Sequence, residues 1–297
     1  MKTQIINPDN IPSIEEMSQF LTNLEDISYH ESIVSKALKI SKAIPEVEAV
    51  FLFGSLSMGN ADIFSDIDFY LLHEDKIDYK DIMDSFLAEV NTLGDIIHIF
   101  QSNAKKNSII IYLKPFIKFE LVVESYSTLC TEWRLAKRAR LIYDKIGLGE
   151  KAIKESKREE FSLEPHLDEI RNLALDLPSF CFLISGYMMR GEYITIIDFV
   201  AWIRRKLLRI SGFMLGLWEE GTRRAEQRFP TELIRYFERC KVKDIDDVWD
   251  CLLVFLEWYS DWLVPKFEEH NIIHANQEVS IIKSAIVKLR ESFHDKT

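Results

Sequence analysis

The stretch FLFGSLSMGNADIFSDIDFYLL, residues 51–72, places two aspartates two positions apart in an apolar run that follows a Gly-Ser step. A strand of this composition is expected to bury one face, and its side chains alternate between the two faces. Asp66 and Asp68 therefore share a face, while Ile67 turns into the core. Two carboxylates on one face repel each other unless a cation lies between them. The stretch therefore predicts a cation-binding site on a sheet.

The Gly-Ser step predicts a turn that holds phosphate. Glycine lets a backbone approach a ligand closely, and the first amides of a short helix point at an anion. Gly54 and Ser55 stand at the end of the preceding strand, where such a turn is useful. Mg²⁺ is the cation expected there, because it prefers oxygen ligands and is commonly shared with substrate phosphates.

A third carboxylate comes from a later strand, FIKFELVVE, residues 116–124. Glu120 and Glu124 fall on the same face of this strand by alternation. Three carboxylates with two metal ions can clamp the attacking and leaving oxygens of an in-line phosphoryl displacement. The alternative for Glu120 is an ion pair with Lys118 or another neighbour.

Composition and net charge limit the classes of protein to which this chain can belong. The chain has 297 residues, of which 47% are hydrophobic and 12% aromatic, which is enough for real cores and favours two domains. The formal net charge of −11 argues against a protein that mainly grips nucleic acid, because such domains usually carry a basic face. It leaves room for a cationic small-molecule substrate.

The sequence carries no sign of a membrane or of an oxidising compartment. The four cysteines have no metal-ligand spacing, and three of them lie in apolar helical patterns. The first residues lack the apolar core of a signal peptide, and apolar stretches are cut by charges before the roughly 20 residues that a span needs. A reducing cytoplasm is the expected location.

The N-terminal half mixes strand and helix patterns. Apolar residues at helical spacing predict two helices within residues 13–44 and another over 79–93. Runs rich in β-branched and aromatic residues predict five strands and a short sixth, over residues 47–54, 66–73, 95–100, 108–113, 116–124 and 141–144. A mixed five- to six-stranded sheet with helices is therefore expected for a domain over residues 1–150.

From about Phe161 onward the strand patterns stop. Helical spacing predicts helices over residues 165–190, 193–216, 230–239, 244–270 and 277–294. Pro178 is expected to kink or interrupt the first of these helices, and Gly191 to end it. Residues 151–297 are therefore expected to form an all-helical bundle domain, and the fold class is α+β.

The motif resembles that of a known superfamily. The order hydrophobic-Gly-Ser, ten residues, then Asp-hydrophobic-Asp-hydrophobic is similar to the signature of the DNA polymerase β-like nucleotidyltransferases. Here it runs from Phe53 to Phe69 and is followed by an acidic residue on a later strand. SDIDFYLL, FELVVES, ARLIYDK (139–145) and MMRGEYI (188–194) also resemble the antibiotic-modifying branch, most nearly a lincosamide nucleotidyltransferase and more distantly the aminoglycoside nucleotidyltransferases.

This resemblance implies a two-domain enzyme that transfers a nucleoside monophosphate from an NTP to a hydroxyl of a small molecule and releases pyrophosphate. The acceptor would be a lincosamide or aminoglycoside, bound by the helical domain, and a homodimer is a candidate assembly. Asp66, Asp68 and Glu120 would be catalytic and would hold Mg²⁺, in two ions. Gly54, Ser55 and Ser65 would bind the nucleotide. Glu120, Glu124 and Glu192 are alternatives for the general base, and the alternative for Glu192 is a surface ion pair with Arg190.

The chain departs from the family pattern at Met58, because members often have a basic residue just before the Gly that stands here at 59. The replacement candidates are Arg134, Lys137, Arg138, Arg140, Arg190, Arg204 and Arg205. Two other functions compete with the leading one. The first is nucleotidyl transfer to tRNA or to a protein, and the second is a non-catalytic nucleotide-binding or antitoxin-like module.

Overall fold

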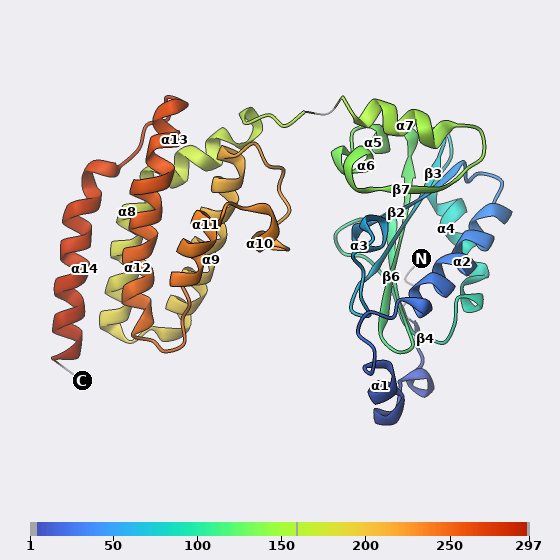
Figure 1. The fold of residues 1–297 in the computed structure, drawn as a ribbon, viewed down its shortest axis with the longest axis horizontal. Coiled ribbons are helices and arrows are strands. Elements are labelled where there is room, and N and C mark those ends of the chain that lie inside the picture. The colour runs from blue at the N-terminus through green and yellow to red at the C-terminus, as the bar shows by residue number, and fades with distance from the viewer. Residues whose placement is uncertain (1–4, 159, 296–297) are drawn as a thin grey trace. The chain divides into compact units, whose positions relative to one another are not determined.

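The structure is a computed structural model that describes residues 5–158 and 160–295. The chain divides into two compact units, residues 1–160 and 161–297 (Figure 1). Each unit has its own buried core, and each is described separately below.

The first unit is built on a mixed seven-stranded sheet with the order β1-β4-β5-β6-β3-β2-β7. The strands are β1 Ile5–Ile6, β2 Ala49–Phe53, β3 Ile67–His73, β4 Ile96–Gln101, β5 Ser108–Leu113, β6 Ile117–Ser125 and β7 Arg140–Asp144. Neighbouring strands are antiparallel except for the central pair β3 and β6, which is parallel. This parallel pair brings two segments about fifty residues apart into register.

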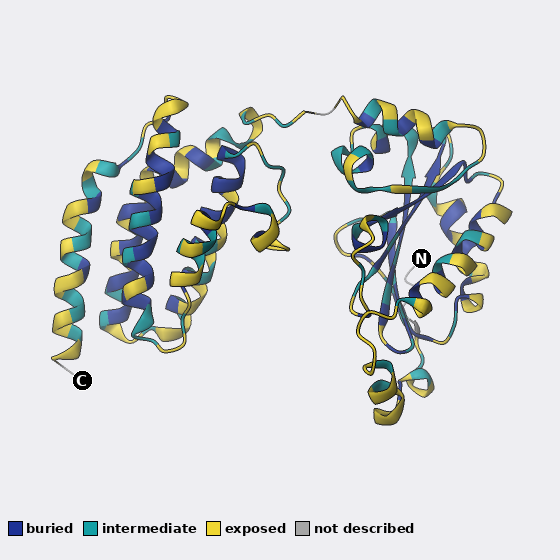
Figure 2. Cartoon of the chain, in the orientation of Figure 1, coloured by how far each residue is buried: buried dark blue, intermediate teal, exposed yellow. Residues whose placement is uncertain are grey.

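Helices cover both faces of the sheet. They are α1 Ile14–Phe20, α2 Ser28–Ala43, α3 Gly54–Met58, α4 Tyr79–Ala88, α5 Tyr126–Cys130, α6 Trp133–Arg138 and α7 Leu148–Ser156. Apolar residues of α2 and α4 pack with one face of the sheet, where Phe69 and Phe119 are fully buried. Figure 2 shows the central strands coloured largely as buried. The opposite face packs with residues from α5, α6 and α7 over part of its area. The remainder of that face carries the polar site described below.

The sheet confirms the α+β prediction and adds one strand to it. All six predicted strands are present within one or two residues of their predicted bounds. The seventh, β1, pairs with β4 through two residues, which is too short to show the alternation that identifies a strand in sequence. β3 begins at Ile67, so Asp66 immediately precedes the strand.

The division between the units lies ten residues later than the predicted boundary at 150. Helix α7 belongs to the first unit, because Ala152 is fully buried in a cluster with Ala49 and Phe51 of β2. A Cβ atom at Gly149 would lie 2.8 Å from Leu141 Cδ1 and 2.9 Å from Ala49 Cβ, so the helix approaches the sheet closely. Helical periodicity alone could not show which core this helix joins.

The second unit is all-helical, as predicted. Its helices are α8 Leu167–Arg190, α9 Tyr193–Met214, α10 Ala225–Arg228, α11 Thr231–Arg239, α12 Asp247–Glu257, α13 Val264–Glu269 and α14 Val279–His294, with a π-helical turn over Trp258–Leu263. Trp249, Trp258 and Phe255 lie in the centre of its core. Within the described residues, no helix is long and apolar enough to cross a membrane.

The interruption expected at Pro178 does not occur, because α8 continues through it to Arg190. Leu177 and Cys181 on either side are fully buried, and their packing offsets the roughly 3 kcal/mol that an interior proline costs a helix. Gly191 ends the helix in the left-handed conformation, at φ +70°, which confirms that prediction.

Candidate active site

The Gly-Ser turn lies against one of the predicted aspartates. β2 ends at Phe53, which pairs with Asp68 of β3, and α3 begins at the next residue. Gly54 has φ +68°, and a Cβ atom there would lie 2.6 Å from Asp68 Oδ2. Glycine is therefore required at this position both for its backbone conformation and for the space that the carboxylate occupies.

The third predicted carboxylate is brought to the same place by the parallel strand pair. Asp68 of β3 and Glu120 of β6 are direct partners in the register. Lys118, two residues before Glu120, shares its face of β6 and bridges the cluster: its ammonium Nζ lies 3.1 Å from Asp66 Oδ2 and 3.2 Å from Glu120 Oε2. Asp66, Asp68 and Glu120 thus gather on one sheet face, as their spacing predicts.

The cluster is held by hydrogen bonds and by opposite charge. The Ser108 hydroxyl of β5 donates to Glu120 Oε1 at 2.8 Å, which fixes one oxygen of that carboxylate. Burial opposes the charge of Lys118, but Asp66 and Glu120 outweigh burial and raise the pKa of Lys118. Lys118 therefore stays protonated and neutralises part of the repulsion between the carboxylates.

Carboxylate oxygens are ligands that suit a hard divalent cation. The cation that bridges Asp66 and Glu120 in this structure, however, is the Lys118 ammonium. Among the described residues there is no group of three or more carboxylate, histidine or cysteine side chains arranged to hold a metal ion. The ion pair of Glu120 with Lys118 is the alternative that the sequence offered for this residue. The set of three metal ligands, Asp66, Asp68 and Glu120, therefore stays a prediction.

The two predicted serines differ in their surroundings. Ser55 is buried in α3 directly after Gly54. The Ser65 hydroxyl accepts a hydrogen bond from the Asp62 amide at 3.0 Å, and the Ser65 carbonyl lies 2.9 Å from His30 Nε2. Ser65 therefore stabilises the turn before Asp66.

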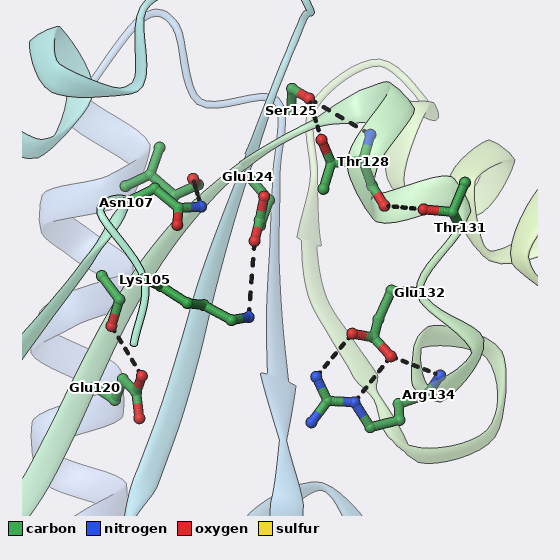
Figure 3. Close-up of polar contacts among 11 residues, drawn as sticks. Lys105, Asn107, Glu120, Glu124, Ser125, Thr128, Thr131, Glu132 and Arg134 are labelled. Atoms are coloured by element: carbon green, nitrogen blue, oxygen red, sulfur yellow. Dashed lines mark hydrogen bonds and ion pairs between the residues drawn. The ribbon is translucent and has the colours of Figure 1, made fainter. Parts of the chain in front are cut away.

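Arg134 is one of the basic candidates, and it lies close enough to Asp68 for their charges to interact. Its guanidinium forms a two-point contact with Glu132, at 2.8 Å from Nε and 2.7 Å from Nη2 (Figure 3). Glu132 raises the pKa of Arg134 most, and the charge of Asp68 adds to the effect. The guanidinium also lies 5.9 Å from the centre of the Phe53 ring, just before the Gly-Ser turn.

The remaining predictions concern the Arg190–Glu192 pair and Met58, and the simpler interpretation holds for both. Arg190 Nε donates to Glu192 Oε1 at 2.5 Å on the surface of the helical unit, next to the glycine that ends α8. Met58, at the end of α3, is 54% exposed and supplies no charge. The pairing of Arg190 with Glu192 is the surface ion pair that the sequence offered as an alternative.

A cavity of about 380 Å³ opens on the same sheet face as the carboxylates. Tyr70 is two residues beyond Asp68 on β3, and Glu124 is four residues beyond Glu120 on β6. The cavity is lined by Tyr70, Lys105, Asn107, Glu124, Thr128, Leu129, Thr131 and Glu132. Figure 3 shows the polar contacts of Lys105, Asn107, Glu124 and Glu132. Of these, Glu124 alone carried a sequence signal, because the others belong to no recognisable motif. A larger cavity of about 680 Å³ lies by α1 and α2 and contains none of the predicted site residues.

Comparison with known families identifies this arrangement. Residues 35–123, which contain the Gly-Ser turn and all three carboxylates, match the family described as polymerase beta, nucleotidyltransferase. The N-terminal unit thus contains a nucleotidyltransferase domain over these residues, and the protein is a nucleotidyltransferase. No curated protein matches the chain.

Solved structures resemble the nucleotidyltransferase at low sequence identity. An aminoglycoside 6-adenyltransferase from Bacillus subtilis is 13% identical with a TM-score of 0.37, over 89% of this chain and 97% of that one. A spectinomycin adenyltransferase from Enterococcus faecialis is 9% identical with a TM-score of 0.34, over 88% and 99%. The non-canonical poly(A) polymerase complex GLD-2–GLD-3 is 12% identical with a TM-score of 0.30, over 97% and 90%. Because each TM-score is below 0.5, no activity is carried over from them.

Proposed function

We propose that the protein transfers a nucleoside monophosphate from an NTP to a hydroxyl group of a small molecule and releases pyrophosphate. One observation carries this proposal: Asp66 and Glu120 share a single bridging cation, and Asp68 lies between Glu120 and a glycine turn with φ +68°. A site that gathers three carboxylates beside an anion-accepting turn is suited to binding metal and phosphate together.

In this proposal the backbone around Gly54 and Ser55 receives the triphosphate. Asp66 and Asp68 would hold Mg²⁺, which neutralises phosphate charge when it is bound. The charge of Arg134, close to Asp68, would take the place of the basic residue that Met58 lacks. Ser65 would act by fixing the turn that leads to Asp66.

Glu120 is the proposed general base. It would accept the proton of the acceptor hydroxyl while the acceptor oxygen bonds to the α-phosphorus and the bond to the bridging oxygen breaks, so that pyrophosphate leaves with the electron pair. The hydrogen bond from Ser108 to Glu120 Oε1 holds one carboxylate oxygen, and the other faces the Lys118 ammonium. The same strand carries Glu124, too far along β6 to share this task directly.

The acceptor is proposed to be a lincosamide or an aminoglycoside. The sequence resemblance to the antibiotic-modifying branch supports this, and the net charge of −11 suits a cationic acceptor. We also propose that the helical unit, residues 161–297, contributes to acceptor binding and that a homodimer is the functional assembly. The same charge disfavours tRNA as acceptor, and the presence of all three carboxylates disfavours a non-catalytic module.

The test is pyrophosphate release with each NTP against a panel of lincosamides and aminoglycosides. Asp68→Asn should lower turnover at least about 100-fold, because it removes a charge at the reacting phosphates. Asp84→Asn, an exposed position on α4 of the same domain, is the matched control and should leave turnover unchanged. Thermal unfolding of both variants checks that they fold.

Two results would contradict the proposal. Turnover that survives Asp68→Asn in a folded variant would remove Asp68 from the site. Labelling of tRNA or of a protein from radioactive NTP, with no small acceptor labelled, would show that the acceptor class is wrong.

A further inference from the structure

The cavity beside the carboxylates already contains a bound cation, supplied by the chain itself. The ammonium of Lys105 lies 3.9 Å from Glu124 Oε1 and 5.6 Å from the centre of the Tyr70 ring (Figure 3). A carboxylate beside an aromatic face is an arrangement that binds organic cations in general. The cavity is therefore built to receive an ammonium group, whichever molecule provides it.

The groups around this cation are largely buried. The Glu124 side chain is 13% exposed, so its charge has lost most of its water. Tyr70 is 8% exposed and lines the cavity. An ammonium group between them therefore interacts with both at short range and with little screening by solvent.

The two carboxylates of the cavity are held very differently. Glu132 is fixed by the two-point contact with Arg134, at 2.7 and 2.8 Å. Glu124 meets Lys105 at 3.9 Å, well beyond the roughly 2.7–2.9 Å of a strong charged hydrogen bond. Lys105 lies in the connection between β4 and β5, and its side chain is 38% exposed. Lys105 can therefore move into solvent at small cost while Glu124 stays in place.

One wall of the cavity, at Glu132, borders Arg134 and the proposed phosphate site, and the opposite wall lies away from it and suits the acceptor. In the sheet order, the Gly-Ser turn at the end of β2 lies on one side of β3, whereas Asn107 and β5 lie on the other side of β6. The carboxylates of β3 and β6 stand between them. An in-line displacement needs the attacking oxygen opposite the departing pyrophosphate, which places the acceptor away from the phosphate turn.

We propose that this cavity is the acceptor subsite, that it binds an ammonium group of the acceptor between Glu124 and the Tyr70 ring, and that Lys105 occupies this place until the acceptor displaces it. The proposal rests on the proposed nucleotidyl transfer for the identity of the ligand. The ligand class is a compact amine with polar groups, since Asn107 and Thr128 line the remaining wall, where they are held by hydrogen bonds to the Val123 carbonyl and the Ser125 hydroxyl. A volume of about 380 Å³ is at the small end of ligand pockets and suits one or two rings.

The test is equilibrium binding to the full-length protein by calorimetry, without nucleotide. The probe is 2-deoxystreptamine, a ring with two ammonium groups, and myo-inositol is its uncharged counterpart. Glu124→Gln should weaken probe binding roughly 5- to 10-fold, the size of one partly screened charge contact. Lys105→Met should strengthen it by a similar factor, because the internal competitor is gone. Glu150→Gln, exposed on α7, is the matched control.

Opposite signs for the two variants are the diagnostic result, since mere loss of structure would weaken binding in both. The proposal is overturned if the probe binds neither the wild type nor Lys105→Met, if both variants change binding in the same direction, or if myo-inositol responds as the probe does. Thermal unfolding of each variant checks folding.

The experiments distinguish failure of the proposed subsite from failure of the proposed nucleotidyl transfer. Pyrophosphate release with some acceptor, together with unchanged probe binding in the variants, would reject this subsite and leave the reaction intact. The predicted binding pattern without pyrophosphate release from any acceptor would leave the subsite intact and reject the reaction.

Discussion

Lys118→Met tests whether the Lys118 ammonium holds the carboxylate cluster together. Its contacts to Asp66 and Glu120 are 3.1 and 3.2 Å, and its side chain is 27% exposed. At an effective dielectric constant of about 20, one such pair attracts by about 5 kcal/mol. Desolvation and side-chain ordering offset most of this gain, so we expect the substitution to lower local stability by about 2 kcal/mol.

The assay is native-state hydrogen exchange followed by mass spectrometry in the presence of a metal chelator. A loss of about 2 kcal/mol corresponds to roughly 30-fold faster exchange. We expect this acceleration in peptides from β3 and β6, and no change in peptides from α12, which belongs to the other unit. Lys76→Met is the matched control, because the ion pair of Lys76 with Glu74 is on the surface and its loss should leave exchange in β3 and β6 unchanged.

Mg²⁺ provides the second half of this test. In Lys118→Met the carboxylates lack their ammonium, so a divalent cation should protect β3 and β6 more than it does in the wild type. A cation at 100 times its dissociation constant stabilises by about 2.7 kcal/mol, which is enough to restore the whole loss. The reasoning is refuted if exchange in β3 and β6 is unchanged by Lys118→Met, or if Mg²⁺ protects the wild type and the variant equally.

Two further substitutions test other contacts of the same domain. Gly54→Ala places a Cβ atom 2.6 Å from Asp68 Oδ2 at φ +68°, so turnover should fall at least about 10-fold, whereas Gly59→Ala, at φ +72° with open space around it, should reduce turnover much less. Glu132→Gln tests pH dependence: burial opposes the charge, but Arg134 lowers the pKa of Glu132 below its ordinary 4.5. The stability that ionised Glu132 contributes through Arg134 is fully present above the ordinary pKa. It is lost as pH falls through the lowered pKa of the folded protein. Thermal midpoints between about pH 6 and pH 3 should therefore drop less in Glu132→Gln than in the wild type; an equal drop would contradict the assignment.

The site could be predicted in part because its motif is local. The spacing from Gly54 to Asp68 and the alternation along the strands fix which side chains share a face, whatever the rest of the chain does. The same periodicities gave the fold class and nearly all element positions. The interruption expected at Pro178 was wrong, because burial of neighbouring side chains outweighs the local preference against a helix.

What the sequence by itself determined is the acidic face and the phosphate turn, because both follow from residue order over fewer than twenty positions. The tertiary structure decided what meets that face. Lys118 reaches Asp66 across 52 residues through the parallel pairing of β3 with β6, and that register is set by packing of the whole sheet. Lys105, from the connection between β4 and β5, reaches Glu124 because β5 pairs with β6. Contacts between residues far apart in the sequence depend on the free energy of strand pairing across the whole sheet. No periodic pattern of the sequence reports that free energy.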